Sequence, residues 1–172
     1  PFDDPVMIER FNKMIDYVFS QIPDVELAAL YIGSEFDVYM QWVVNNDPKA
    51  WKQYETFYKE TRAHIKSKYP NLKVGAEATF WGLTGEATKE HLKRLNRYSD
   101  IIGVSYYHVD QNNFKVPDPK EIHSAFKEIT ALYSGRPIYF HQFGAPYGAT
   151  LNSSEVKQRE FIREAFKAWD TH

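Results

Sequence analysis

The sequence predicts an α/β fold with a parallel sheet, because short apolar runs alternate with amphipathic segments along all 172 residues. Four mostly continuous apolar runs, at about residues 27–32, 72–76, 101–106 and 137–140, are typical of strands buried on both faces of a parallel sheet. Longer segments with apolar residues at helical spacing flank each run. This helix–strand repeat implies parallel strands joined by right-handed crossovers.

Four of the five expected helices begin with a recognisable cap. Asp4, Asp47 and Asp118 each precede a proline, the pattern of a capping carboxylate before proline at the first helical position. Ser153 or Ser154 is expected to cap the last helix. The expected helices cover roughly residues 5–22, 48–68, 84–98, 119–133 and 155–169.

Composition excludes several classes of protein. Lys plus Arg is 21 and Asp plus Glu is 23, so no excess of positive charge predicts a nucleic-acid partner. No apolar run reaches the ~18 residues that span a bilayer, and no signal-peptide pattern opens the sequence. The absence of cysteine excludes disulfides, thiolate metal sites and cysteine nucleophiles. The 12 Tyr, 12 Phe and 4 Trp either fill the core, which composition favours, or stack on flat ligands such as sugar rings.

Two architectures fit the repeat: a doubly wound sheet, or part of a (β/α)8 barrel. No glycine-rich phosphate loop follows any strand, which argues against a nucleotide-binding doubly wound sheet. A whole barrel takes ~250 residues, so four strands and five helices amount to about half of one. The sequence also begins with Pro1 rather than Met. We therefore expect residues 1–172 to form a single domain that is a barrel fragment.

Polar residues stand beside aromatic residues wherever an expected strand ends. The four segments are Gly33–Asp37, Glu77–Trp81, Tyr106–Asp110 and His141–Tyr147. Chemistry in parallel α/β folds gathers at the carboxyl ends of the strands, so these segments are the expected site. The alternative is that they are ordinary solvated loops, which share this composition.

Three of these segments resemble motifs of the clan A (β/α)8 glycoside hydrolases, the group of cellulases, mannanases and arabinogalactanases. Residues 31–35, Tyr-Ile-Gly-Ser-Glu, resemble the fourth strand, which usually ends in Gly-Asn-Glu. Residues 100–107 resemble the sixth strand. Residues 136–144, which include His-Gln-Phe-Gly, resemble the seventh strand, which usually ends in Thr-Glu-Phe-Gly. The resemblance implies a fragment holding about strands four to seven with their flanking helices.

The resemblance implies that Glu35 is the general acid/base and that position 142 is the nucleophile. Gln142, however, is a neutral amide that cannot be expected to form the covalent glycosyl intermediate, and Ser34 replaces the asparagine that holds the sugar 2-hydroxyl. Three explanations stay open: a natural glycan binder, an enzyme whose second carboxylate is Glu77 or Asp37, or a position changed to trap a complex.

Other residues are expected to contact substrate. Trp81 and Tyr147 are candidates for stacking on sugars, and Tyr107 and His141 are expected to orient groups around Gln142. Aromatic walls around Glu35 would raise its pKa, as a general acid requires, and Tyr31, Phe36, Trp81 and Tyr107 are the candidates for them. The full expected binding set is Ser34, Glu77, Trp81, Tyr107, His108, His141 and Tyr147.

The sequence therefore predicts a glycoside hydrolase-like protein that binds and hydrolyses a β-linked oligo- or polysaccharide without a cofactor, nucleic acid or membrane. The alternative is a non-catalytic glycan-binding protein. A metal-dependent barrel hydrolase or isomerase, with ligands from His108, Asp110, His141 and Glu77, is less favoured because no familiar metal-ligand spacing is present. The resemblance also implies an extracellular or periplasmic protein. Exposed sheet edges predict that the missing barrel half, or a second copy, covers them.

Overall fold

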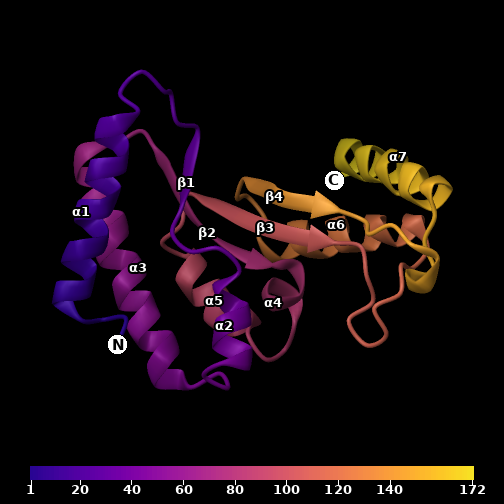
Figure 1. The fold of residues 1–172 in the computed structure, drawn as a ribbon, viewed down its shortest axis with the longest axis horizontal. Helices are drawn as coiled ribbons and strands as arrows, with labels where there is room; N and C mark the ends of the chain where they lie inside the picture. Colours follow the sequence, from indigo (N-terminus) through magenta and orange to yellow (C-terminus); the bar gives the residue numbers. More distant parts are fainter.

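The computed structural model describes residues 1–172 and contains one four-stranded parallel sheet. Its strands β1 (Ala29–Tyr31), β2 (Lys73–Thr79), β3 (Ile101–Tyr107) and β4 (Ile138–Gly144) lie side by side in chain order (Figure 1). A doubly wound sheet reverses its strand order at a switch point, whereas barrel strands follow one another in sequence. The fold is therefore a half-barrel, as the sequence predicts.

The helices begin where the capping residues predict. Each predicted cap accepts a hydrogen bond from a backbone N–H two or three residues further on; these caps are Asp4, Asp47, Asp118 and Ser154. The helices are α1 (Pro5–Gln21), α2 (Phe36–Trp42), α3 (Pro48–Lys68), α4 (Phe80–Thr84), α5 (Lys89–Asn96), α6 (Ile122–Leu132) and α7 (Glu155–Thr171), with 3-10 turns η1 (Pro119–Glu121) and η2 (Ala149–Leu151). No helix is long and apolar enough to cross a lipid bilayer.

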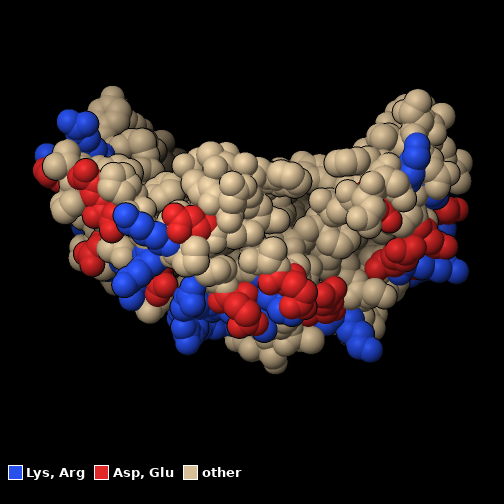
Figure 2. Space-filling model, turned by 90° about the horizontal axis from the view of Figure 1, so that it is seen from below, with Lys and Arg blue, Asp and Glu red and all other residues tan.

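The two faces of the sheet differ in chemistry. Side chains on the helix-facing side are apolar and join one buried core with the helices; they include Val74, Ala76, Ala78, Ile102, Val104 and Tyr106. The alternate positions, which form the inner face of the half-barrel, are small or polar, among them Glu77, Gly103 and Ser105. Figure 2 shows the resulting crescent, with most charged side chains along its lower edge and few in its hollow.

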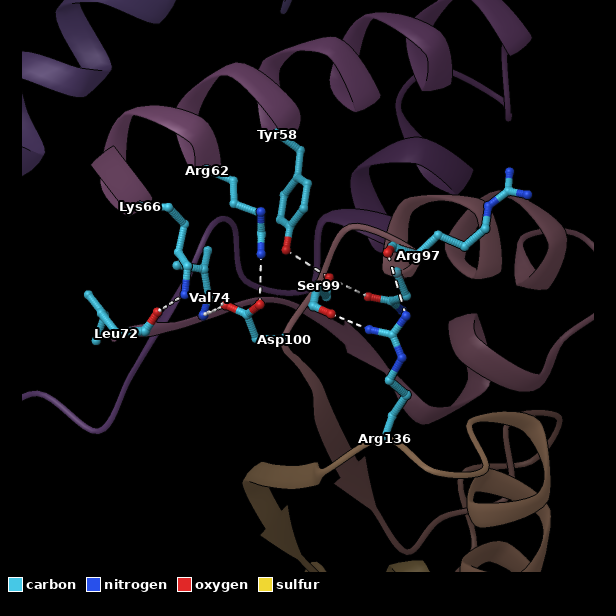
Figure 3. Close-up of polar contacts among 10 residues, drawn as sticks. Tyr58, Arg62, Lys66, Leu72, Val74, Arg97, Ser99, Asp100 and Arg136 are labelled. Atoms are coloured by element: carbon cyan, nitrogen blue, oxygen red, sulfur yellow. Dashed lines mark hydrogen bonds and ion pairs between the residues drawn. The ribbon is translucent and has the colours of Figure 1, made fainter. Parts of the chain in front are cut away.

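A polar network holds together the starts of three strands (Figure 3). The Asp100 carboxylate accepts hydrogen bonds from Arg62 (2.7 Å), Lys66 (3.1 Å) and the backbone N–H of Val74 (3.0 Å). Burial opposes ionisation of Asp100, but these donors prevail and hold its pKa below the usual value. Arg136, just before β4, donates to the carbonyl oxygen of Ser99. Helix α3 is thus tied to the end of the sheet opposite the expected site.

The structure corrects the sequence prediction in three places. Strands β2 and β4 continue to Thr79 and Gly144, so Glu77 and Gln142 lie inside strands rather than in loops. The helix expected over 84–98 is shorter, α5 over Lys89–Asn96, and a separate short helix, α4, precedes it and ends at the extended backbone of Gly85. Helix α2, directly after Glu35, was not predicted.

Candidate functional site

Glu35 lies at the carboxyl end of β1 with its carboxylate directed across the sheet. The chain turns sharply at Gly33 (φ 88°), and Glu35 itself is left-handed (φ 46°) as it caps helix α2. The Ser105 hydroxyl of β3 donates a hydrogen bond to Glu35 Oε1. Left-handed backbone at a residue other than glycine is strained and persists only where surrounding contacts hold it. Here the turn and Ser105 fix the half-buried carboxylate over the inner face.

Gln142 is held from both ends of its amide. The Tyr107 hydroxyl donates to Gln142 Oε1 at 3.1 Å, and Gln142 Nε2 donates to Glu77 Oε1 at 3.2 Å. Gln142 is also the register partner of Ser105, which binds Glu35. The structure therefore brings together, at Ser105, the two positions expected to hold the acid/base and the nucleophile.

Glu77 lies beneath this surface, and its side chain is 0% exposed. Gln142 covers one of its oxygens. His141 Nδ1 lies 3.0 Å from the other oxygen, Oε2, but is not aligned for a hydrogen bond, so that oxygen has no donor. The Tyr31 ring packs against the His141 ring at 5.2 Å between centroids. Burial, followed by the charge of Glu77, raises the pKa of Tyr31 to about 12, so Tyr31 stays protonated beside the carboxylate.

Asp37 joins two elements of the fold. It is fully buried and accepts hydrogen bonds from the backbone N–H (3.0 Å) and hydroxyl (2.6 Å) of Thr79 at the end of β2. Burial raises its pKa, although the bonds from Thr79 oppose the shift. Gly82 has no side chain, and the Asp37 carboxylate occupies the space where a Cβ atom of residue 82 would lie. Asp37 therefore fastens α2 to β2 and has no oxygen free for a substrate.

His108 is not brought to this site. It is 1% exposed, with Nδ1 hydrogen-bonded to Tyr106 Oη (2.8 Å) and Nε2 to the Asp118 carbonyl (3.0 Å), and its ring stacks on Phe161. Burial lowers the pKa of His108, which favours a neutral ring. The expectation of substrate binding is corrected here, because His108 shares the helix-facing side of β3 with Tyr106.

The remaining expected binding residues lie at the exposed edge. Tyr107 and Tyr147 are 49% and 63% exposed, and Trp81 is partly exposed within α4, edge-on to Phe80. Ser34 is exposed, and neither Ser34 nor Tyr147 makes a side-chain hydrogen bond. No group of three or more His, Asp or Glu side chains converges as a metal-binding set. The aromatic side chains form exposed apolar surface suited to flat ligands.

One residue of the site was missed by sequence reasoning, Ser105, which anchors Glu35. Ser105 is a lone hydroxyl inside the apolar run 101–106, which is a signal that could have pointed to it. Tyr31, expected in the aromatic wall around Glu35, packs on the His141 ring over Gly103.

Comparisons with known proteins agree with the architecture. No protein-family model and no curated protein matches the sequence. Fourteen chains of solved structures match its fold, and two of these matches illustrate the likeness. The exo-β-1,4-mannosidase Op5Man5 from Opitutaceae bacterium strain TAV5 matches 97% of this chain and 32% of its own, with TM-score 0.67 and 15% identity. The GH39 enzyme from Xanthomonas axonopodis pv. citri matches 83% and 30%, with TM-score 0.57 and 18% identity.

The chain thus spans about a third of the length of the solved chains that it matches. Identities of 15% and 18% establish likeness of fold alone. The fold that the resemblance implies is confirmed: residues 1–172 have the fold of part of a (β/α)8 barrel.

Proposed function

We propose that the protein containing this chain binds and hydrolyses a β-linked oligo- or polysaccharide, with Glu35 as general acid/base. The observation that carries the proposal is the fixed Glu35 carboxylate, held by Ser105 beside Gln142 at the carboxyl edge of the sheet. A general acid must be held within hydrogen-bond reach of the leaving oxygen. The exposed rings of Tyr107 and Tyr147 supply flat apolar surface for sugars.

The chemistry divides between Glu35 and its neighbours. Glu35 donates a proton to the glycosidic oxygen as the bond from that oxygen to the sugar breaks. Gln142 cannot take part as a nucleophile, but its Nε2 has a second hydrogen that can bind a sugar hydroxyl. Glu77 and Asp37 are both buried, so neither carboxylate reaches a bound sugar in this arrangement. A group other than these three must therefore complete the reaction.

One observation favours a second candidate, glycan binding without hydrolysis. The Gln142 amide, at the position that the resemblance to clan A glycoside hydrolases assigns to the nucleophile, is hydrogen-bonded at both ends and is well suited to hold a ligand without reacting. Under either proposal the protein is extracellular or periplasmic. The unpaired edges of β1 and β4 are covered by further strands of the longer protein or by a second copy.

The proposal is tested by glycan binding and hydrolysis with the full-length protein. The substrates are β-linked glycans, including β-1,4-mannan because one structural neighbour is an exo-β-1,4-mannosidase. We expect cleavage by the native protein and a loss of about 10²-fold or more in Glu35→Gln, with binding retained. Glu9→Gln, on the exposed face of α1, is the matched control and should cleave normally.

Three other results would change the conclusion. Full activity of Glu35→Gln would refute the role of Glu35. Binding without cleavage by the native protein, with cleavage gained in Gln142→Glu, would establish the non-catalytic alternative. Neither binding nor cleavage across the panel would overturn both proposals.

A further inference from the structure

A groove of about 300 Å³ lies between helices α4 and α6, beside residues 108–112 of the segment that follows β3. Tyr106 and His108 line it, and both belong to the helix-facing side of β3 rather than to the inner face. The proposed acid/base Glu35 does not line it. Helices α4 and α6 follow β2 and β3, the two inner strands of the sheet, so the groove is also away from the unpaired edges of β1 and β4. It is therefore separate from the hollow of the half-barrel.

Trp81 presents an exposed indole ring to this groove. It is 40% exposed, whereas Phe80, the residue before it, is buried and packs nearly perpendicular to the indole at 5.2 Å between ring centroids. This contact holds the indole at the surface of α4. A single exposed aromatic ring is ordinary on a protein surface. The meaning of Trp81 therefore depends on the groups that share the groove with it.

These groups are polar and have no partners within the protein. The side chains of Gln111, Asn112 and Ser124 are exposed and make no hydrogen bonds, and the same is true of the carboxylates of Glu121 and Glu128. Amides, hydroxyls and carboxylates supply both donors and acceptors for the hydroxyl groups of a ligand. An aromatic wall combined with a few polar groups is typical of small-ligand sites. A sugar unit, with apolar ring faces and a rim of hydroxyls, matches this combination.

The segment that carries the two amides is already ordered. Asp110 Oδ1 accepts hydrogen bonds from the backbone N–H groups of Asn112 (2.7 Å) and Asn113 (3.3 Å). The backbone N–H of Phe114 donates to the carbonyl oxygen of Asp110 at 2.8 Å and closes the turn. A turn fixed in advance lowers the cost of ordering side chains when a ligand binds. Gln111 and Asn112 are thus held at the groove by the protein's own hydrogen bonds.

Charge narrows the kind of ligand. Asp110, Glu121 and Glu128 line the groove together with no lysine or arginine, which disfavours phosphate, sulfate and acidic sugars. Burial lowers the pKa of His108, so its ring is neutral and supplies no positive charge. The carboxylates do not converge with one another or with a histidine as a metal-binding set. The chemistry favours an uncharged ligand with hydroxyl groups.

We propose that this groove, which we call the Trp81 groove, is a second carbohydrate-binding site that holds uncharged sugar units of a glycan outside the hollow. The choice of a β-linked glycan rests on the proposed function. The indole of Trp81 stacks on a sugar ring, and the amides of Gln111 and Asn112 bind its hydroxyls. A polysaccharide held here stays tethered near the carboxyl edge of the sheet, which raises its effective concentration at Glu35.

The test measures binding to the full-length protein carrying Glu35→Gln, which prevents cleavage. The probes in equilibrium dialysis are β-1,4-mannotetraose and cellotetraose. Adding Trp81→Ala should remove one bound tetrasaccharide per chain or weaken that site at least 10-fold, whereas Trp81→Phe, which keeps a ring, should weaken it less. Asn112→Ala, in an exposed turn, should weaken it about 3-fold. Trp42→Ala is the matched control, since Trp42 is 80% exposed on α2 and does not line the groove.

Cleavage of the same tetrasaccharides by the protein with Glu35 intact separates the two proposals. Cleavage together with unchanged binding in folded Trp81→Ala and Asn112→Ala would overturn the inference and leave the proposed hydrolase intact. Binding that depends on Trp81, without cleavage, would support the groove and refute hydrolysis. Neither binding nor cleavage would overturn both. If Trp81→Ala instead abolished binding of a hexalysine peptide and left tetrasaccharide binding unchanged, the groove would be a site for a cationic partner and the inference would be wrong.

Discussion

The Gln142→Glu substitution places a second carboxylate against a buried one. Gln142 Nε2 lies 3.2 Å from Glu77 Oε1, and Glu77 is shielded from solvent. The substitution replaces this donor with an oxygen that carries negative charge. Two unit charges about 3 Å apart repel by about 5 kcal/mol at an effective dielectric constant of about 20. The native hydrogen bond is lost as well.

Protonation of one of the two carboxyl groups limits the loss in the free energy of unfolding. Keeping one carboxyl protonated at pH 7 costs about 1.36 kcal/mol for each unit between pH 7 and its unfolded pKa of about 4.3, or about 3.7 kcal/mol. Since this is less than the repulsion, the folded pair shares one proton. Water around the half-buried position 142 reduces the effect further. We expect Gln142→Glu to lower the free energy of unfolding by about 2–4 kcal/mol at pH 7.

The sign of the pH dependence follows from the raised pKa of the pair. Below about pH 4 both carboxyls are protonated in the folded and unfolded states, and the deficit nearly disappears. As the pH rises above about 4.3, the unfolded chain releases its protons while the folded pair retains one, so the deficit grows until the pH passes the raised pKa. The assay is urea-induced unfolding of the full-length protein at intervals from pH 4 to pH 8.

Two further variants isolate the charge effect. Gln142→Met removes the hydrogen bonds without adding charge, and should lose about 1–2 kcal/mol independently of pH. The exchange Glu77→Gln/Gln142→Glu restores one carboxylate beside one amide and should recover most of the loss. Equal stability of Gln142→Glu and the native protein at pH 7 would refute the reasoning. So would a double variant as unstable as the single one.

Three other predictions concern stability and are tested by denaturation. Gly103→Ala should lose about 1–3 kcal/mol because its Cβ would meet the Tyr31 ring at 2.6 Å, whereas Gly144→Ala, with 3.9 Å of clearance, should lose less than 1 kcal/mol; equal losses would contradict this. Asp100→Asn should lose about 1–3 kcal/mol at pH 7. This difference should shrink as the pH falls below about 4, because the donors that lower the pKa of Asp100 stabilise its charged form and not its protonated form. Burial lowers the pKa of His108, so its contribution should be lost as the pH falls below about 6.5, and His108→Gln should remove that component of the acid sensitivity.

The parallel sheet and the helix starts could be predicted because both depend on short-range patterns. Continuous apolar runs at 72–76 and 101–106 require burial on two faces, and Asp47 before Pro48 specifies a helix start. Strand ends could not be predicted in the same way. Glu77 and Gln142 look like loop residues in the sequence, but each is paired with β3 in the sheet, and their side chains are hydrogen-bonded to each other across the inner face.

The positions of Glu35 and Gln142 in the site could be predicted, because sequence motifs mark the ends of their strands. The positions of residues whose place depends on which face of the sheet the side chain occupies could not. Glu35 accepts a hydrogen bond from Ser105, and Gln142 is the register partner of Ser105 in the neighbouring strand. His108 and His141 look equivalent in the sequence, each at the end of an expected strand. His108 packs against Phe161 in the core, whereas His141 is the extra residue at a register shift in β4 and stays exposed beside Glu77. The apolar pattern does not reveal such a shift, yet one residue of register decides which face of the sheet a side chain occupies.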